Sequence, residues 1–404
     1  MSPPARSLAV VFVTLGTFTD LLAYSIAVPV LPDLTVRLGA SPTIIGLLFA
    51  SFGVTLLGVS IPVGTLSDRI GRRWPLVGGM ALLALSTLAF AFATSLPALF
   101  AARLLQGAAD AITWGVGFAL VADLYGPSER GRVMGLVMSG SNVGVMLGPS
   151  IGGWLYETGG AELPFLLVTA LAVIGTAGFL WIPIPAPSEA REDVPFRRLI
   201  RDRDVLACSV LLVVVASTLT MFEPVLALHL SSALGLSPGR IGMVFGVAAL
   251  ASALLHPVYG RLADRFGGRR LMLTGMVVAS AVMPVVGRAE TYQGALTLFL
   301  VQAAALSMIV TPSLTYMAEA GARAGAVSFG VSYGLYNFAW GCGLLAGPAA
   351  GGALYERLGF ARLLTFWPLV VLVTAAWFAV AGRRLAPPAD MPLAHSAHIS
   401  EDRP

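Results

Sequence analysis

Long apolar stretches, separated by short polar turns, run through almost the whole chain and constrain its fold more than any other feature. They lie near residues 8–31, 43–66, 76–95, 97–122, 132–156, 164–183, 205–232, 239–262, 271–289, 291–317, 325–354 and 361–382. An α-helix needs about 20 consecutive apolar residues to cross the hydrocarbon core of a bilayer. The stretches therefore predict an all-α membrane protein with twelve transmembrane helices.

The amino-acid composition excludes a soluble protein. Hydrophobic residues make up 57% of the chain and charged residues 11%, whereas soluble domains contain roughly 25% charged residues. The net charge of +4 is too small to indicate a nucleic-acid partner. Cys208 and Cys342 lie in apolar stretches, so we expect packing residues and not a disulfide. Since no metal-ligand spacing or nucleophile–base set stands out, we expect no metal, no cofactor and no enzymatic activity.

The arginines lie mostly on one side of the predicted membrane. An even number of spans places both termini on one side, and the opposite side carries only Arg37, Arg240, Arg288, Arg357 and Arg362. Positively charged residues concentrate in cytoplasmic loops of membrane proteins. The pattern predicts a multi-pass protein of the cell (inner) membrane with both termini in the cytoplasm. The first apolar stretch is longer than the roughly 7–15 residues of a signal-peptide core, so we expect it to be retained.

A polar segment divides six predicted spans from six. Residues 184–204 are rich in proline and charge and are typical of a linker. We therefore predict an N-terminal six-helix bundle over 1–183, a cytoplasmic linker over 184–204 and a C-terminal six-helix bundle over 205–384. The polar tail over 385–404 is predicted to be disordered and cytoplasmic.

The two halves repeat short motifs in matching places. Gly64-x3-Asp68-Arg69-x-Gly71 after the second span is echoed by Gly260-x3-Asp264-Arg265-x-Gly267 after the eighth. Gly148-Pro149 in the fifth span is echoed by Gly347-Pro348 in the eleventh, and both blocks lead to Leu-Tyr-Glu, at Glu157 and Glu356. Internal duplication is typical of transporter folds, which bind substrate between the halves near the membrane midplane.

These motifs resemble those of the major facilitator superfamily over essentially the whole chain. The Gly-x3-Asp-Arg-x-Gly-Arg-Arg loop is similar to the family signature between spans two and three, and Arg103-Leu-Leu-Gln106-Gly107 to its fourth-span motif. The glycine-rich fifth span, Gly140 through Gly153, resembles the antiporter signature. The resemblance implies two pseudo-symmetric six-helix bundles and favours a drug–proton antiporter. It also implies that Gly144, Gly148, Pro149, Gly347 and Pro348 form a helix-packing motif.

The chain further resembles the vesicular amine transporter branch of this family. Asp20 with Val28-Pro29-Val-Leu-Pro32, Glu129-Arg130-Gly131, and Met221-Phe-Glu223-Pro224 carry this similarity. In that branch the acids that match Asp20 and Glu223 serve amine recognition and proton coupling. The sequence departs from the branch at Phe52, Ser307 and Asn337, where the branch has one lysine and two acids.

Four ionisable side chains fall well inside predicted spans: Asp20, Arg103, Asp110 and Glu223. A charge at a helix centre costs about 2.5–3.5 kcal/mol on insertion scales, so such groups usually face a cavity, pair, or bind something. Asp20, with Tyr24 one turn later, is a candidate proton or cation site; a structural hydrogen bond between helices is the alternative. Glu223 precedes Pro224, whose missing N–H frees a backbone carbonyl beside the carboxylate. The alternative is that Glu223 is hydrated near the periplasmic end.

One stripe of the fourth span carries Arg103, Gln106, Gly107, Asp110, Thr113, Trp114 and Gly117 at helical spacing. Arg103 and Asp110 lie about 10.5 Å apart along a helix axis, so their charges could couple through water or Gln106. We expect Arg103, Gln106, Asp110 and Trp114 to line the substrate and proton site. The alternative is that the two charges neutralise each other and so permit insertion.

The eleventh span carries a polar–aromatic stripe, with Asn142 of the fifth span as a further cavity candidate. The stripe consists of Tyr333, Tyr336, Asn337 and Trp340. Aromatic faces attract organic cations by about 2 kcal/mol or more when desolvated. Packing or an interfacial aromatic belt is the equally weighted alternative.

The two repeated Asp-Arg loops are predicted to form a cytoplasmic gate. Its residues are Asp68, Arg69, Arg72, Arg73, Asp123, Glu129, Arg130, Asp264 and Arg265. We expect Asp68 to accept hydrogen bonds at a neighbouring helix N-terminus, and Arg72 and Arg73 to pair with Asp123 or Glu129. Positive charge that merely sets orientation is the alternative.

Together these features predict a proton-coupled secondary antiporter that exports an organic cation, an amine or a lipophilic drug by alternating access. We expect its partners to be a small-molecule substrate, protons and the lipid bilayer, and the protein to be a monomer. A proton-coupled uptake symporter for a small nutrient and a non-transporting membrane receptor are the alternatives. The repeated Gly-Pro blocks favour the antiporter over the symporter, and the buried acids favour a transporter over a receptor.

Overall fold

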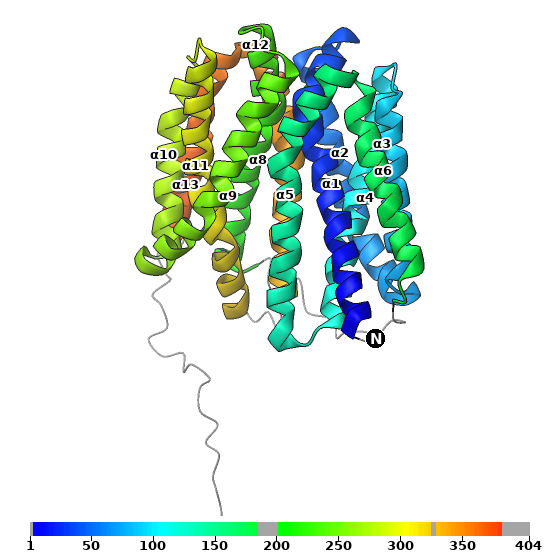
Figure 1. The fold of residues 1–404 in the computed structure, drawn as a ribbon. Coiled ribbons are helices and arrows are strands. Elements are labelled where there is room, and N and C mark those ends of the chain that lie inside the picture. The colour runs from blue at the N-terminus through cyan, green and yellow to red at the C-terminus, as the bar shows by residue number, and fades with distance from the viewer. Residues whose placement is uncertain (1–2, 185–200, 325–328, 382–404) are drawn as a thin grey trace, which may run out of the picture.

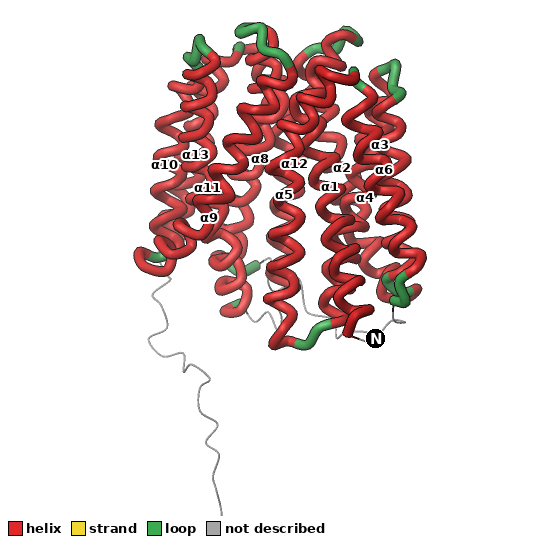
Figure 2. The backbone as a smooth tube through the Cα atoms, viewed as in Figure 1, coloured by secondary structure: helices red, strands yellow, loops and turns green. Residues whose placement is uncertain are grey.

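The computed structural model describes residues 3–184, 201–324 and 329–381. Twelve long helices account for nearly all of this part of the chain (Figures 1 and 2): α1 (Pro3–Arg37), α2 (Pro42–Ile70), α3 (Arg73–Ala91), α4 (Leu96–Leu124), α5 (Pro127–Gly159), α6 (Glu162–Trp181), α8 (Arg203–Ser232), α9 (Pro238–Phe266), α10 (Gly268–Val286), α11 (Tyr292–Arg323), α12 (Phe329–Leu358) and α13 (Phe360–Ala381). The described residues contain no strand. The predicted all-α fold is confirmed.

Ten of these helices are long and apolar enough to cross a membrane, and α5 and α12 are not among them. Both helices carry the repeated Gly-Pro blocks, and both pack along a helix of the opposite half of the chain, α5 on α9 and α12 on α2. A helix that is partly covered by protein needs less apolar surface than one surrounded by lipid. Both helices are therefore partly shielded from lipid by the opposite bundle.

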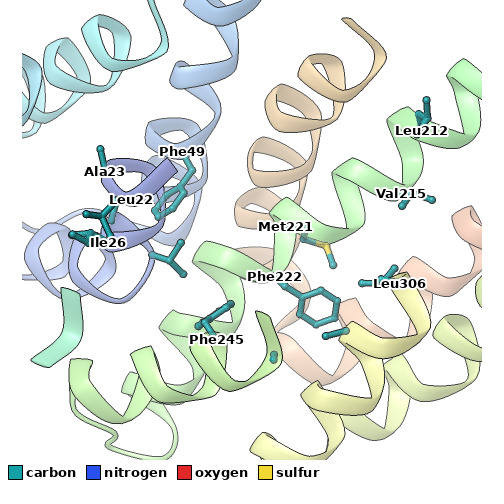
Figure 3. Packing of buried hydrophobic residues seen from close by; sticks show 14 of the residues in the cluster. Leu22, Ala23, Ile26, Phe49, Leu212, Val215, Met221, Phe222, Phe245 and Leu306 are labelled. Carbon is teal, nitrogen blue, oxygen red and sulfur yellow. The ribbon is translucent and has the colours of Figure 1, made fainter. Parts of the chain in front are cut away.

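Helices α1–α6 form one bundle and α8–α13 a second bundle beside it (Figure 1). Most of the predicted linker and all of the predicted tail lie outside the described residues, since α6 ends at Trp181 and α8 begins at Arg203. Helices α1 and α8 bury the largest share of their apolar length. Figure 3 shows Leu22 and Ile26 of α1 and Phe222 of α8 in the packed interior.

The ends of the helices explain several of the repeated sequence motifs. Gly71 and Gly267 end α2 and α9 at φ of 88° and 89°, a left-handed conformation that favours glycine. Ser41, Asp202 and Thr291 accept hydrogen bonds from the first backbone N–H groups of α2, α8 and α11, as N-cap residues do. The short turns that result hold neighbouring helices antiparallel.

Small residues form the seam between the two bundles. A Cβ added at Gly46 of α2 would overlap the backbone oxygen of Pro348 in α12. In the matching place, a Cβ at Gly242 of α9 would overlap the backbone oxygen of Pro149 in α5. Close backbone contact through small residues is how membrane helices associate. These contacts lie toward the side of the bundle that holds Arg37, Arg240 and Arg357, which we name the arginine-poor side.

Candidate functional site: buried charges at the bundle interface

A hydrogen bond between Tyr24 and Glu223 crosses from one bundle to the other. The Tyr24 hydroxyl on α1 donates to Glu223 Oε2 on α8 at 2.5 Å. The next residue, Pro224, lies inside α8 and removes one helical hydrogen bond there. Glu223 forms no ion pair within 4 Å in the part of the chain that the structure describes. A carboxylate at the seam is thus held by a neutral phenol.

The guanidinium of Arg103 lies close to that hydrogen bond, inside a cage of aromatic rings. Its central carbon is 5.5 Å from the Tyr24 ring centroid, 4.7 Å from that of Phe49, 5.8 Å from Phe52 and 5.9 Å from Phe90. The side chain is fully buried, at 0% exposure. Aromatic faces attract cations, by about 2 kcal/mol or more when desolvated, so helices α1–α3 stabilise the charge that α4 carries.

Arg103 makes fewer hydrogen bonds than its five N–H groups allow. Nη1 donates to Gln106 Oε1 at 2.8 Å, while Nε and Nη2 have no hydrogen-bond partner among the described residues. A buried donor without a partner costs about 1–3 kcal/mol. The cage therefore holds a cation with unused hydrogen-bonding capacity beside Tyr24 and Glu223.

Asp20 and Asp110 form a second cluster on the facing sides of α1 and α4. Asp110 lies near Asp20, one turn before Thr113 on α4. Asp20 is 1% exposed and accepts a hydrogen bond from Thr113 Oγ1 at 3.3 Å, and Trp114 lies beside it. The four charged residues inside the helices thus divide into two clusters, whereas the sequence suggested a link between Arg103 and Asp110. Gln106 binds Arg103, but Asp110 faces Asp20, and no ion pair joins Arg103 to Asp110 in the described part of the chain.

The polar–aromatic stripe of α12 was expected to face the substrate cavity, and the structure agrees with this only in part. Tyr336 stacks on Trp340, with ring centroids 6.2 Å apart, and its hydroxyl lies 3.3 Å from Ser313 Oγ of α11. Tyr336 therefore packs within its own bundle. Asn337 is exposed, and the Tyr333 side chain lies outside the described residues. Asn142 on α5 is also exposed and donates to its own helix at Met138 O, so the structure does not bring it to the buried charges.

The N-terminal gate loop is organised around Arg72. Its guanidinium contacts Asp68 at 2.5 Å and Asp123 at 2.9 Å. Partial burial opposes the charge of Arg72, but the hydrogen bonds and negative charges of Asp123 and Asp68 outweigh it and raise the pKa of Arg72. The pairing with Asp123 agrees with the expectation. The expectation for Asp68 is wrong in this structure, since Asp68 is bound by Arg72 and not by the N-terminus of a neighbouring helix.

The other gate residues are placed differently from the expectation. Arg73 donates to the Leu180 carbonyl of α6 and not to an acid, because its helix start lies beside the end of α6. Arg130 donates to the Ala122 carbonyl at 2.8 Å. No ion pair was found for Arg69, Glu129, Asp264 or Arg265 within the described ranges. A pocket of about 480 Å³ at the start of α5 is lined by Tyr125, Glu129, Arg132, Val133 and Leu136, and it contains none of the buried charges.

Two glutamates on the arginine-poor side join the bundles in a way that the sequence did not reveal. Glu356, at the end of α12, accepts hydrogen bonds from Ser41 Oγ and from Thr43 N at the start of α2, both at 2.9 Å. Glu157, at the end of α5, accepts one from Gly239 N at the start of α9 at 3.0 Å. Helix N-termini carry partial positive charge and favour carboxylates. The repeated Leu-Tyr-Glu was the signal for this pair, which we name the outer latches.

The glycines of the Gly-Pro blocks face helices of their own bundle. Gly144 and Gly148 of α5 lie against α1, where Ser25 Oγ donates to the Gly144 carbonyl at 3.0 Å. Gly347 of α12 lies against Ser217 and Thr220 of α8 in the same manner. Each block therefore lets one helix contact the central helix of its bundle on one face and the opposite bundle on another.

Comparison with known proteins agrees with this architecture. Among solved structures, a bacterial homologue of the human lysosomal transporter Spinster, in an inward-facing and unoccupied conformation, superimposes with a TM-score of 0.82 at 16% identity, covering 95% of this chain and 98% of that one. The human organic anion transporter MFSD10 gives a TM-score of 0.65 at 21% identity, covering 94% of this chain and all of that one (100%). At these identities the likeness concerns the fold.

Sequence relatives carry the comparison further. The synaptic vesicular amine transporter of Homo sapiens is 28% identical over 334 residues, which cover 82% of this chain and 65% of that protein. The probable vesicular acetylcholine transporter-B of Danio rerio is 29% identical over 377 residues, covering 89% and 76%. The predicted resemblance to the vesicular amine branch is confirmed, although the chain spans only about two thirds of the length of the first of these relatives. The profile described as Major Facilitator Superfamily matches residues 13–221 and 208–396. A match over nearly the whole chain, on two six-helix bundles with repeated motifs, shows that this multi-pass membrane protein belongs to the major facilitator superfamily.

Proposed function

We propose that the protein is a proton-coupled antiporter that exports an organic cation, an amine or a lipophilic drug, from the cytoplasm. One observation carries the proposal: the Glu223 carboxylate lies at the seam of the bundles and is held there by the Tyr24 hydroxyl. No basic side chain in the described part of the chain forms an ion pair with Glu223 within 4 Å. A cationic substrate supplies that missing charge, and a proton neutralises it instead.

Exchange follows from this competition. The Glu223 carboxylate binds either a cation or a proton, so arrival of one displaces the other, and Tyr24 closes the bundle contact when the site holds no cation. The guanidinium of Arg103 keeps a fixed positive charge beside Tyr24. The names of the relatives, an amine transporter and an acetylcholine transporter, support a cationic substrate.

The direction of transport rests on the arrangement of the seam. The outer latches and the glycine contacts join the bundles on the arginine-poor side, and this supports entry of substrate to Glu223 from the arginine-rich side. Positive residues favour the cytoplasmic side. We therefore place both termini in the cytoplasm and the protein in the cell (inner) membrane. Because one chain contains both bundles, we propose a monomer.

The test uses proteoliposomes with an acid interior and an enclosed pH-sensitive dye. Tetraphenylphosphonium, ethidium and a panel of amines are added outside, and proton efflux is recorded for the wild type, Glu223→Gln and Glu290→Gln. Glu290 is an exposed acid between α10 and α11, so its variant controls for loss of an arbitrary carboxylate. We expect cation-driven proton efflux in the wild type and the control, and a loss of at least about tenfold in Glu223→Gln.

Two results would contradict this function. Proton efflux that no cation triggers, together with uptake of a neutral or anionic nutrient with protons, would replace the antiporter by a symporter. Full activity in Glu223→Gln would remove Glu223 from the site.

A further inference from the structure

His256 lies inside the membrane-spanning helix α9, and neither the cation site at Glu223 nor the outer latches use it. Its ring Nδ1 lies 2.7 Å from Thr311 Oγ1 on α11, and Thr311 Oγ1 lies 2.8 Å from the Ser307 carbonyl oxygen. A carbonyl oxygen only accepts hydrogen bonds, so the single hydroxyl proton of Thr311 is donated to Ser307. His256 Nδ1–H therefore donates to Thr311.

This arrangement leaves the second ring nitrogen of His256 free. In a neutral imidazole one nitrogen carries the proton and the other accepts hydrogen bonds, so Nε2 is the acceptor. Nε2 makes no hydrogen bond among the described residues, and the side chain is exposed. The bond to Thr311 thus fixes both the tautomer and the orientation of the ring.

The position of His256 on its helix shows which side of α9 it occupies. Gly246 of α9 packs against Ser150 of α5, whereas Ala253 and Pro257, two and three turns further along the same face, are exposed. Helix α5 therefore no longer covers α9 toward the arginine-rich side. His256 directly precedes Pro257 and lies at the edge of this uncovered face.

The lipid-facing side of α9 is a different one. Leu250 and Leu254, one turn apart, are 44% and 68% exposed, as expected for contact with acyl chains. Leu254 precedes His256 by two residues, which places their side chains on nearly opposite sides of the helix. His256 lies instead three turns beyond Phe245, which packs on Phe299 of α11 with ring centroids 5.1 Å apart. The imidazole thus faces the opening between the bundles and not the lipid.

His256 also lies between Glu223 and the arginine-rich end of the molecule. Phe222, next to Glu223, packs on Phe299, and Phe299 packs on Phe245, so Phe245 marks the depth of the cation site on α9. His256 is three turns further toward the arginine-rich end, about 16 Å along the helix axis. A substrate that enters from that side passes the imidazole before it reaches Glu223.

The same side of α11 continues the polar lining toward the arginine-rich end. Thr315 and Glu319 follow Thr311 at intervals of one turn, and both are exposed. Glu319 forms no ion pair in the part of the chain that the structure describes. Because an unpaired carboxylate attracts cations, an entering cation should meet Glu319, then Thr315, and then His256.

We propose that His256 Nε2 is an entry site for a protonated amine, whose ammonium N–H donates a hydrogen bond to the ring before the cation passes to Glu223. This inference rests on the proposed antiport function and names its substrate class more closely. An ammonium group with at least one N–H satisfies Nε2, whereas a quaternary ammonium or a phosphonium ion has no proton to donate. Such ions reach Glu223 without this contact, so the entry site favours amines over them.

Nitrogen-15 NMR of the full chain, labelled at histidine and held in lipid nanodiscs at about pH 8, tests the site without transport. Imidazole is mainly neutral at that pH, and the signals lost in His256→Leu are those of His256. The added cations are N,N-dimethylphenethylammonium, with one N–H, and N,N,N-trimethylphenethylammonium, with none. We expect the proton on Nδ1, and an Nε2 signal that shifts with the dimethyl cation and stays with the trimethyl cation. Thr311→Val should release the tautomer, so that both ring nitrogens carry the proton in turn.

Transport of the same two cations measures the effect on entry. Cation-driven proton efflux is recorded in proteoliposomes with an acid interior, and the signal of protein-free liposomes is subtracted. His256→Leu should lower kcat/KM for the dimethyl cation at least about threefold, through KM, and leave the trimethyl cation within about 1.5-fold. His256→Gln, which keeps an acceptor, should lose less. His229→Gln, near the outer end of α8, should change neither cation, and preserved transport of the trimethyl cation shows that each variant is folded.

Three outcomes would overturn the entry site. The first is an Nε2 signal that ignores the dimethyl cation or moves equally with both cations. The second is a His256 ring that carries its proton on Nε2 in the wild type. The third is an equal loss of transport for both cations in His256→Leu, which would leave the ring a structural role only. A wild type that shows the NMR shift but exchanges no cation for protons would instead count against the antiport function and leave the amine site standing.

Discussion

The two bundles share their framework but differ in charge, and the gate loops show this most clearly. Arg73 and Arg269 both donate to a carbonyl in the last helix of their own bundle, at Leu180 and Ala379. In the first loop Gly71 is followed by Arg72, which binds Asp68 and Asp123. In the second loop Gly267 is followed by Gly268, and Asp264 forms no ion pair in the described part of the chain.

The interior of the bundles repeats this contrast. The N-terminal bundle buries Asp20 and Arg103 and half-buries Asp110, whereas the C-terminal bundle contributes Glu223 at the seam and otherwise buries uncharged polar groups such as Gln302 and Ser313. Features that the backbone requires, such as the helix-ending glycines and the outer latches, are kept in both halves. The charged side chains and their partners differ between the two halves. The two bundles therefore differ in the charge that they carry and not in their backbone framework.

Overpacking inside the N-terminal bundle should have the largest effect. A Cβ at Gly107 of α4 would overlap the Phe52 carbonyl and Thr55 of α2, so Gly107→Leu should lower the free energy of unfolding by about 3 kcal/mol or more. Gly115→Leu, on the same helix in open space, should cost little. Thermal unfolding in detergent and the yield of monodisperse protein measure both. Similar losses in the two variants would mean that α2 and α4 are not closely packed.

The second-largest effect concerns the hydrogen bonds made by two tyrosine hydroxyls, those of Tyr24 and Tyr336. Tyr24→Phe removes the hydroxyl that donates to Glu223 but keeps the ring over Arg103, and hydrogen bonds to charged groups contribute about 1.5–3 kcal/mol. Tyr336→Phe removes a neutral contact to Ser313 at 3.3 Å and should cost about 0.5–1.5 kcal/mol. Chemical or thermal unfolding of both variants should show the larger loss for Tyr24. A larger loss for Tyr336→Phe would place the stronger contact in the C-terminal bundle.

The gate loops should differ by a smaller amount. Arg72→Gln removes both contacts to Asp68 and Asp123, so we expect a loss of about 1 kcal/mol in the free energy of unfolding. Arg265→Gln, in the matching loop, removes a charge that makes no ion pair among the described residues and should be nearly neutral. Unfolding measured at low and high salt provides the check, because screening should reduce only the effect of Arg72→Gln. Equal effects at both salt concentrations would show that Arg72 acts through packing.

The outer latches should show the smallest effects and a pH dependence. Hydrogen bonds from Thr43 and Ser41 lower the pKa of Glu356 below its ordinary value. The contribution of Glu356 to the closed seam is therefore present above that ordinary pKa and is lost as the pH falls through the lowered one. Glu157 accepts one hydrogen bond, against two at Glu356. We expect Glu356→Gln to open the seam slightly more than Glu157→Gln.

Spin-label distances across each seam measure this difference. Labels at Ala40 and Arg357 report on α2 and α12, and labels at Thr158 and Arg240 report on α5 and α9, in a chain that carries Cys342→Ala so that this cysteine is not labelled. Acidification should lengthen the first distance in the wild type and leave it unchanged in Glu356→Gln. A first distance that does not respond to pH in the wild type would exclude Glu356 as a latch.

Much of the site could be anticipated from single residues, but its grouping could not. Intramembrane charge singles out Asp20, Arg103, Asp110 and Glu223 because each is costly to bury. Helical spacing then links Arg103 to Asp110, since only neighbours on one helix are visible in a sequence. The structure instead brings Asp110 near Asp20 and places Arg103 near Tyr24, because the packing of α1 against α4 decides which side chains meet.

The sequence by itself determined the twelve helices, their division into two bundles and the family. These follow from local properties: apolar length, glycines that end helices, and motifs repeated at matching positions. Only the tertiary structure decided that Tyr24 meets Glu223, that Thr113 of α4 bonds Asp20 of α1, and that Glu157 and Glu356 cap helices of the opposite bundle. Such contacts join residues far apart in the chain, and they depend on how closely small residues allow the helices to approach.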